Sequence, residues 1–135
     1  MKLYEKDNLV ILENVENFDA KAIFTCGQAF RWYEETDGSF TTVHLGRVLN
    51  VLNDDNKVIF KGTNLEEFNE IWIDYFDLNT NYKEIRKTLS NNEILANAMD
   101  YGKGIRILNQ NHFEMLISFI ISANNMIPRI KNLLK

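Results

Sequence analysis

Two amides and a guanidinium lie close together near the C-terminal end of the chain, at Asn124, Asn125 and Arg129, and Pro128 directly precedes the arginine. Such side chains offer the hydrogen-bond donors and acceptors that read base edges in nucleic acids. Asn also suits the end of a helix, because it tolerates left-handed dihedrals, and Pro suits the first turn of the next helix. The spacing predicts a tight helix–turn–helix corner, whose polar groups either cap the helices or meet a ligand.

A second run with potential chemistry is Cys-Gly-Gln-Ala-Phe-Arg-Trp, from Cys26 to Trp32. Gly27 can supply a positive dihedral or let two backbones approach closely. A glycine of this kind serves a structural turn as readily as a binding site. The residue types in this run therefore leave both interpretations open.

Together the two blocks resemble the 8-oxoguanine DNA glycosylase/AP lyase family. Cys26–Trp32 is similar to the family signature Gly-Gln-x-Phe-Arg-Trp. The stretch from Gly104 to Ile130 resembles a family run with a Gly–hydrophobic–Arg strand, a Gln and a Ser-x-Asn-Asn-x-Ile-x-Arg-Ile segment, in this order. Two blocks at the expected separation argue against coincidence. The resemblance covers nearly all of this chain, but only the first part of the enzyme.

The resemblance implies contacts with damaged DNA for Gly27, Asn124, Asn125 and Arg129. Gly27 corresponds to the glycine whose carbonyl accepts the N7 hydrogen that 8-oxoguanine has and guanine lacks. Guanine N7 is itself an acceptor, so the same carbonyl disfavours the normal base. Asn124 matches the asparagine that fills the gap in the duplex and contacts the orphaned cytosine. Arg129 matches the arginine that helps to recognise that cytosine, and Asn125 lies beside them.

The chain departs from the family pattern within the corner. Met126 stands where a third asparagine is common, and Ala123 where some members have serine. The loss of polar groups here predicts weaker discrimination of the base opposite the lesion. The remaining residues of the first block are predicted to support the glycine loop and not to contact DNA: Gln28, Phe30, Arg31 and Trp32.

The resemblance also implies that the catalytic machinery lies elsewhere. In this family a lysine amine in a helix-hairpin-helix module attacks the sugar and forms a Schiff base, assisted by a downstream aspartate. Both lie beyond Lys135, and Lys131 and Lys135 are interpreted as solvated helix residues. We therefore expect no catalytic residue in this chain, and neither glycosylase nor lyase activity from it alone.

Two other interpretations stay open at this stage. One is a catalytically inactive DNA-binding or protein-interaction module of the same fold. The other is an unrelated small α+β ligand binder, which requires both motif blocks to be coincidental. Metal and cofactor chemistry find no support, because His44, His112 and Cys26 are isolated and lack metal-ligand spacing.

Composition and charge indicate the class of protein and the kind of partner. Apolar residues make up 45% of the 135 residues, which is typical of a globular protein. The net charge is −4, yet residues 101–135 hold five cations against one anion, so an acidic body carries a basic end. This pattern fits contact with double-stranded DNA through one face. No apolar run is long enough to span a bilayer, and a single cysteine fits the cytoplasm, at the nucleoid in a bacterium.

The elements that must position these blocks follow from periodicity and turn signals. Residues 3–15 predict a strand or a hairpin turning at Asp7-Asn8, and residues 17–24 a short helix. Four strands with regular turns predict an antiparallel meander: 30–33, 40–45, 48–52 and 58–60. Helices follow over 65–76, 82–89 and 91–101. The predicted class is α+β, with a twisted antiparallel sheet covered by helices and then the first helices of an all-α domain.

The boundary between the two domains is placed after residue 104, so residues 1–104 form the α+β domain and 105–135 the truncated start of the helical catalytic domain. Helical spacing over 113–123 predicts a helix with one face in the core: Phe113, Leu116, Ile117, Ile120 and Ile121. Without the remainder of the catalytic domain from a longer parent chain, this helix loses packing partners. The exposed apolar patch then favours dimers or aggregation.

Overall fold

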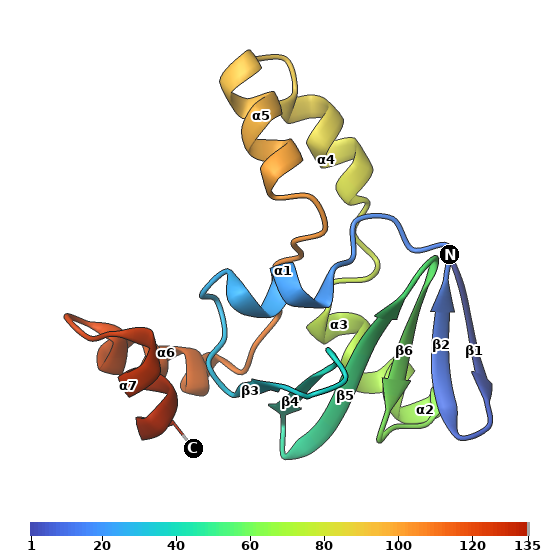
Figure 1. The fold of residues 1–135 in the computed structure, drawn as a ribbon, viewed down its shortest axis with the longest axis horizontal. Helices are drawn as coiled ribbons and strands as arrows, with labels where there is room; N and C mark the ends of the chain where they lie inside the picture. The colour runs from blue at the N-terminus through green and yellow to red at the C-terminus, as the bar shows by residue number, and fades with distance from the viewer. Residues whose placement is uncertain (135) are drawn as a thin grey trace.

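A single antiparallel sheet of six strands forms the body of the protein in the computed structural model, which describes residues 1–134. The strands lie in the order β1-β2-β6-β5-β4-β3 (Figure 1). Their bounds are β1 (Lys2–Lys6), β2 (Leu9–Glu13), β3 (Trp32–Glu34), β4 (Phe40–His44), β5 (Arg47–Asp54) and β6 (Lys57–Lys61). The helices are α1 (Ala20–Thr25), α2 (Leu65–Glu67), the π-helical turn η1 (Phe68–Trp72), α3 (Ile73–Tyr75), α4 (Tyr82–Leu89), α5 (Glu93–Tyr101), α6 (His112–Ser122) and α7 (Ile127–Leu133).

Tight turns define the hairpins. The predicted turn at Asp7-Asn8 is confirmed, and both residues have positive φ, of 53° and 60°. Strand β4 ends one residue before the predicted end at Leu45, and β5 begins one residue before the predicted start at Val48, because Arg47 already pairs with His44 in the ladder. Strand β5 also extends to Asp54, two residues beyond the predicted end at Leu52. Two-residue turns suit the twist of paired strands, so the ladders extend further than the turn signals indicated.

The N-terminal hairpin joins the meander into one sheet through β2 and β6, with Val10 opposite Phe60 and Leu12 opposite Val58. The sequence predicted both pieces but not this pairing. The helical segment α2–η1–α3 covers the apolar face, behind the sheet in Figure 1. Aromatic rings fill the layer between, with Phe60 and Phe68 centroids 4.5 Å apart. The predicted α+β class is confirmed.

The last four helices form two pairs (Figure 1). The α4–α5 pair stands away from the sheet and is closed by Arg86, which pairs with Asp100 at 3.3 Å. The α6–α7 pair lies next to β3, reached by an extended segment after Gly104. None of the described helices has the length and apolar character needed to cross a membrane.

The predicted core face of α6 is largely exposed, which corrects the expectation from periodicity. Phe113 is 70% exposed, Leu116 54% and Ile120 60%, whereas Ile117 and Ile121 are partly buried. Apolar periodicity indicates which face can be buried, but burial requires an opposing element. Within residues 1–134, no element buries Phe113, Leu116 or Ile120.

A matched pair of truncations tests this assignment of the core. Phe60→Ala should lower the free energy of unfolding by about 3–5 kcal/mol, because it opens a cavity in a fully buried aromatic layer. Phe113→Ala should change it by less than about 0.5 kcal/mol, as exposed positions usually do. Urea denaturation measures both values, and an equal loss from the two variants would contradict the structure.

Candidate nucleic-acid interface

The corner between α6 and α7 has the predicted helix–turn–helix geometry. Asn124 adopts a left-handed φ of 54°, as the sequence indicated. Asn125 donates from Nδ2 to the carbonyl of Ile121 at 3.1 Å and so caps the last turn of α6. Pro128 is the second residue of α7. The tight turn is confirmed, and the amide of Asn125 is occupied within it.

The other polar side chains of the corner face solvent. Asn124 and Arg129 are both exposed. Met126 is 76% exposed and occupies the N-cap position of α7 without a side-chain hydrogen bond. Asn124 and Arg129 are therefore available to a ligand, whereas Asn125 shapes the turn.

Gly27 lies in the exposed loop after α1 with φ of +90°. A Cβ at this position would meet no heavy atom within 4 Å, so the dihedral and not crowding requires glycine here. Within residues 1–134 the Gly27 carbonyl accepts no hydrogen bond. This loop thus presents a backbone acceptor to solvent.

The side chain of Gln28 fixes the glycine loop to a segment eighty residues away. Its Nε2 donates to the Arg106 carbonyl at 2.8 Å, and its Oε1 accepts from the Leu108 amide at 2.9 Å. Gln110 adds a bond from Nε2 to the Gln28 carbonyl at 2.6 Å. Trp32 donates from Nε1 to the Ala29 carbonyl at 2.9 Å and closes the loop. The predicted supporting role of Gln28 and Trp32 is confirmed.

The Arg106 segment corrects two expectations. Residues 105–110 are extended but pair with no strand. Arg106 was counted with the basic end, yet it is only 4% exposed and donates to the carbonyls of Asn17 at 3.0 Å and Asp77 at 2.5 Å. Its guanidinium also lies 4.5 Å from the Tyr82 ring centroid. Burial lowers the pKa of Arg106. This cation holds the fold together and is not available to DNA.

Adjacent residues of the first block contact both helices of the corner. Arg31 pairs with Glu114 of α6, with Nη1 and Oε2 3.3 Å apart. Lys131 of α7 lies with Nζ 3.4 Å from the Trp32 ring centroid. The interpretation of Lys131 as a solvated residue is therefore wrong, and Lys135 lies outside the described residues. No sequence motif pointed to either contact, since each joins positions more than eighty residues apart.

A buried imidazole lies beside this junction. His44 packs against Tyr75 with ring centroids 4.4 Å apart. Burial lowers the pKa of His44, and the nearby charges of Glu114 and Asp74 oppose that effect. Burial also raises the pKa of Tyr75 to about 12. Within residues 1–134, no cluster of three or more His, Cys, Asp or Glu side chains is arranged to hold a metal ion.

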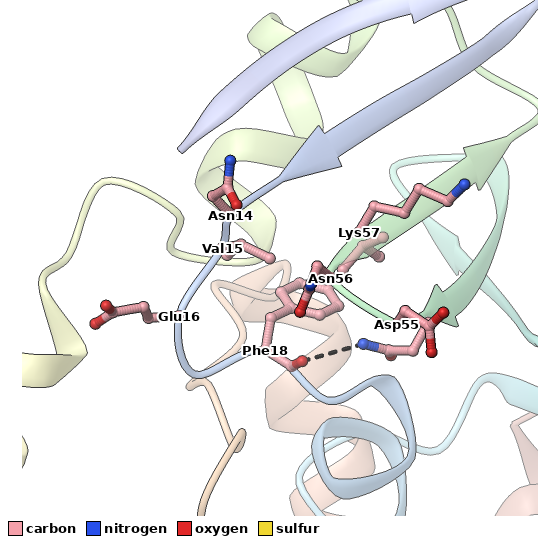
Figure 2. A pocket seen from close by; sticks show the side chains of 9 residues that line it. Asn14, Val15, Glu16, Phe18, Asp55, Asn56 and Lys57 are labelled. Carbon is pink, nitrogen blue, oxygen red and sulfur yellow. Dashed lines mark hydrogen bonds between the residues drawn. The ribbon is translucent and has the colours of Figure 1, made fainter.

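A hollow lies elsewhere, between the end of β2 and the β5–β6 turn (Figure 2). Asn53 bridges it to α1, donating to the Phe18 carbonyl at 3.1 Å and accepting from the Ala20 amide at 2.8 Å. Glu16 and Asp55 make its rim partly acidic, which disfavours a phosphate backbone. No residue predicted for the site lines this hollow, so we assign it to the seam between helix and sheet.

The buried imidazole predicts a pH dependence of stability. Because the folded-state pKa of His44 is lowered, the unfolded chain binds a proton more readily below about pH 6.5. The free energy of unfolding should therefore fall as the pH drops from about 7.5 to 5.5. Urea denaturation of His44→Gln should show a shallower slope over this range, and the matched exposed variant His112→Gln the parental slope. Equal slopes for His44→Gln and the parent would contradict this assignment.

Comparison with known proteins agrees with this geometry. A family model described as the N-terminal domain of 8-oxoguanine DNA glycosylase matches residues 10–116. The Clostridium acetobutylicum 8-oxoguanine glycosylase/lyase in its apo-form is 47% identical, with a TM-score of 0.92 over 96% of this chain and 45% of that one. Its complex with double-stranded DNA containing cytosine opposite 8-oxoG is 46% identical, with a TM-score of 0.93 over 97% and 45%.

MBOgg1 in complex with a low-affinity DNA ligand is 46% identical, with a TM-score of 0.92 over 96% of this chain and 45% of that one. No curated protein sequence matched. The chain spans somewhat less than half the length of these solved relatives. The family model nevertheless covers most of it, and the chain therefore belongs to the 8-oxoguanine DNA glycosylase family, a family of DNA glycosylases/lyases, as its N-terminal part.

Proposed function

We propose that this chain is the recognition part of a DNA repair glycosylase that removes 8-oxoguanine from duplex DNA in base excision repair. The observation that carries the proposal is the direct contact between the two motif blocks. Arg31 and Trp32, next to the glycine loop, hold Glu114 and Lys131 of the α6–α7 pair. One recognition unit can then read the damaged base and its partner together.

Gly27 is assigned to the damaged base. Enzymes that act on a base within a duplex first extrude it into a pocket. Gly27 is an exposed residue, and its carbonyl accepts no hydrogen bond within residues 1–134. An acceptor of this kind bonds the protonated N7 of 8-oxoguanine and repels the N7 lone pair of guanine. The chemistry of one backbone oxygen thus supplies the discrimination.

The corner is assigned to the opposite base. Asn124 and Arg129 are exposed and polar, and Arg and Asn side chains pair well with base edges. Asn125 takes part through the shape of the turn, because its amide caps α6. The cytoplasm, at the nucleoid in a bacterium, is the compartment in which this DNA substrate is met.

The catalytic steps are assigned to polypeptide beyond this chain. We place the domain boundary after residue 104, with 105–135 as the first helices of the catalytic domain. The exposed apolar side chains of α6 are the surface on which the remainder of that domain packs. In its absence the same surface favours a dimer. By itself, the chain binds damaged DNA without excising the base.

Borohydride trapping tests this division of labour. A duplex with 8-oxoguanine opposite cytosine is offered to this chain and to a longer parent that continues into a helix-hairpin-helix. Trapping by the parent alone is the expected result, because the Schiff-base lysine lies beyond Lys135. A covalent adduct with this chain would overturn the claim that it lacks a catalytic amine. Trapping by neither would favour the catalytically inactive DNA-binding or protein-interaction module.

Gly27→Ala tests the lesion contact. The variant should lose most of the preference for an 8-oxoguanine duplex over a guanine duplex, because alanine disfavours a φ of +90° and the carbonyl turns away. Fluorescence anisotropy measures both dissociation constants. Gly38→Ala is the matched control, since its φ is +80° and it lies in the β3–β4 turn. An unchanged preference in Gly27→Ala would contradict the assignment.

Met126→Asn tests the departure from the family pattern. Asn is a favoured N-cap residue, so the variant should raise the free energy of unfolding by about 1 kcal/mol. It should also increase the preference for cytosine over adenine opposite the lesion, measured as a ratio of dissociation constants. Met115→Asn is the control, because it makes the same substitution within α6 and not at an N-cap position. A ratio that stays at the parental value would show that Met126 has no part in opposite-base discrimination.

A further inference from the structure

Lys131 connects α7 to the block that contains the glycine loop. Its Nζ lies 3.4 Å from the centroid of the Trp32 ring and 5.8 Å from that of Tyr33. An ammonium within about 6 Å of an aromatic face is attracted by the ring quadrupole. The Trp32 contact is well inside this range. Lys131 is therefore seated on the indole and does not extend freely into solvent.

The Trp32 ring is a rigid surface for this contact. Its indole N–H donates to the Ala29 carbonyl at 2.9 Å, which ties the ring to the glycine loop. The ring also packs against Phe24 and Phe40 of the core, with centroids 6.2 and 5.9 Å away. A cation seated on a ring held in this way fixes the helix that carries it.

Helix geometry links this contact to Arg129. Successive residues of an α-helix are rotated by about 100°, so residues two apart point to nearly opposite sides. With Lys131 on Trp32 and Ile130 buried, Arg129 must point outward, and its side chain is indeed exposed. A rotation of α7 about its axis would move both side chains at once.

We propose that Lys131 is a positioning residue: its contact with Trp32 sets the rotation of α7 and so presents Arg129 to the base opposite the lesion. The Arg31–Glu114 ion pair holds α6 to the same block. The role of Arg129 in this inference rests on the proposed function. The inferred rotation of α7 does not rest on the proposed function, because that rotation follows from contacts within the chain.

The rotation of α7 can be measured without DNA, from residual dipolar couplings of the α7 amides. Lys131→Met keeps the length of the stem and removes the cation, whereas Lys131→Arg keeps the cation. We expect altered α7 couplings in Lys131→Met and couplings close to the parental values in Lys131→Arg. The control Lys87→Met, on α4, removes the same charge elsewhere and should leave the couplings of the α7 amides unchanged. Parental couplings in Lys131→Met would overturn the proposal.

The consequence for recognition is measured with duplexes that carry 8-oxoguanine opposite cytosine or adenine. Lys131→Met should lower the preference for cytosine by about three-fold, in keeping with the loss of one cation–π contact. Because Lys131 acts through Arg129, adding Lys131→Met to an Arg129→Met variant should not lower the preference for cytosine over adenine any further. Additive losses would overturn the proposal. Equal weakening on both duplexes would assign Lys131 to phosphate contact instead, and would also overturn it.

The two measurements separate this inference from the proposed function. If the parental chain shows no preference for lesion duplexes, the proposed function fails, and the α7 couplings still decide whether Lys131 sets the helix. If the lesion is bound but the couplings and the cytosine preference survive Lys131→Met, the proposed function stands and the positioning role is wrong.

Discussion

The hydrogen bonds of Gln28 hold the glycine loop to the extended segment that leads into α6. The Gln28 side chain donates to the Arg106 carbonyl and accepts from the Leu108 amide. It thus provides hydrogen-bond partners for the backbone of an extended segment that pairs with no strand. A buried backbone without partners is costly, and a side-chain amide that mimics a strand removes that cost. The glycine loop and the start of α6 are thereby fixed to each other. The candidate interface depends on the Gln28 hydrogen bonds, because they join the glycine loop to the segment that carries the α6–α7 corner.

Arg106 strengthens the same link in a different way. Its guanidinium is buried and donates to main-chain carbonyls of Asn17 and Asp77, and it stacks on Tyr82. Burying a cation is unfavourable unless its donors are satisfied, and carbonyl oxygens satisfy them here. The cation thus ties the loop before α1 to the start of α4. The energetic cost of its burial is offset only when all of these segments are in place.

Local patterns in the sequence predicted the elements well. The turn residues Asp7 and Asn8 located the N-terminal hairpin, and Pro128 marked the start of α7, which the structure confirms. Pairings between distant segments had no local signal. The β2–β6 ladder, the Gln28 bonds and the Lys131–Trp32 contact each join residues far apart in the chain. Charge counting failed at Arg106 for the same reason, because composition does not reveal which cation is buried.

The apolar periodicity of α6 shows a second limit. It correctly predicted a helix, yet Phe113 and Ile120 are exposed, because periodicity reports a face suited to burial and not the partner that buries it. For the candidate site, the sequence named Gly27, Asn124, Asn125 and Arg129 by family resemblance. The structure distinguishes among them physically: Asn125 is engaged in the turn, whereas Asn124 and Arg129 are exposed. Their contacts with DNA stay predictions.

The central claim is that the glycine loop and the corner form one recognition unit. The most direct measurement is an NMR titration of the labelled chain with a duplex that carries 8-oxoguanine opposite cytosine. The account predicts that the amides of Gly27, Asn124 and Arg129 shift together, with one dissociation constant, and shift less with an undamaged duplex. Shifts confined to one block, or equal shifts with both duplexes, would contradict it.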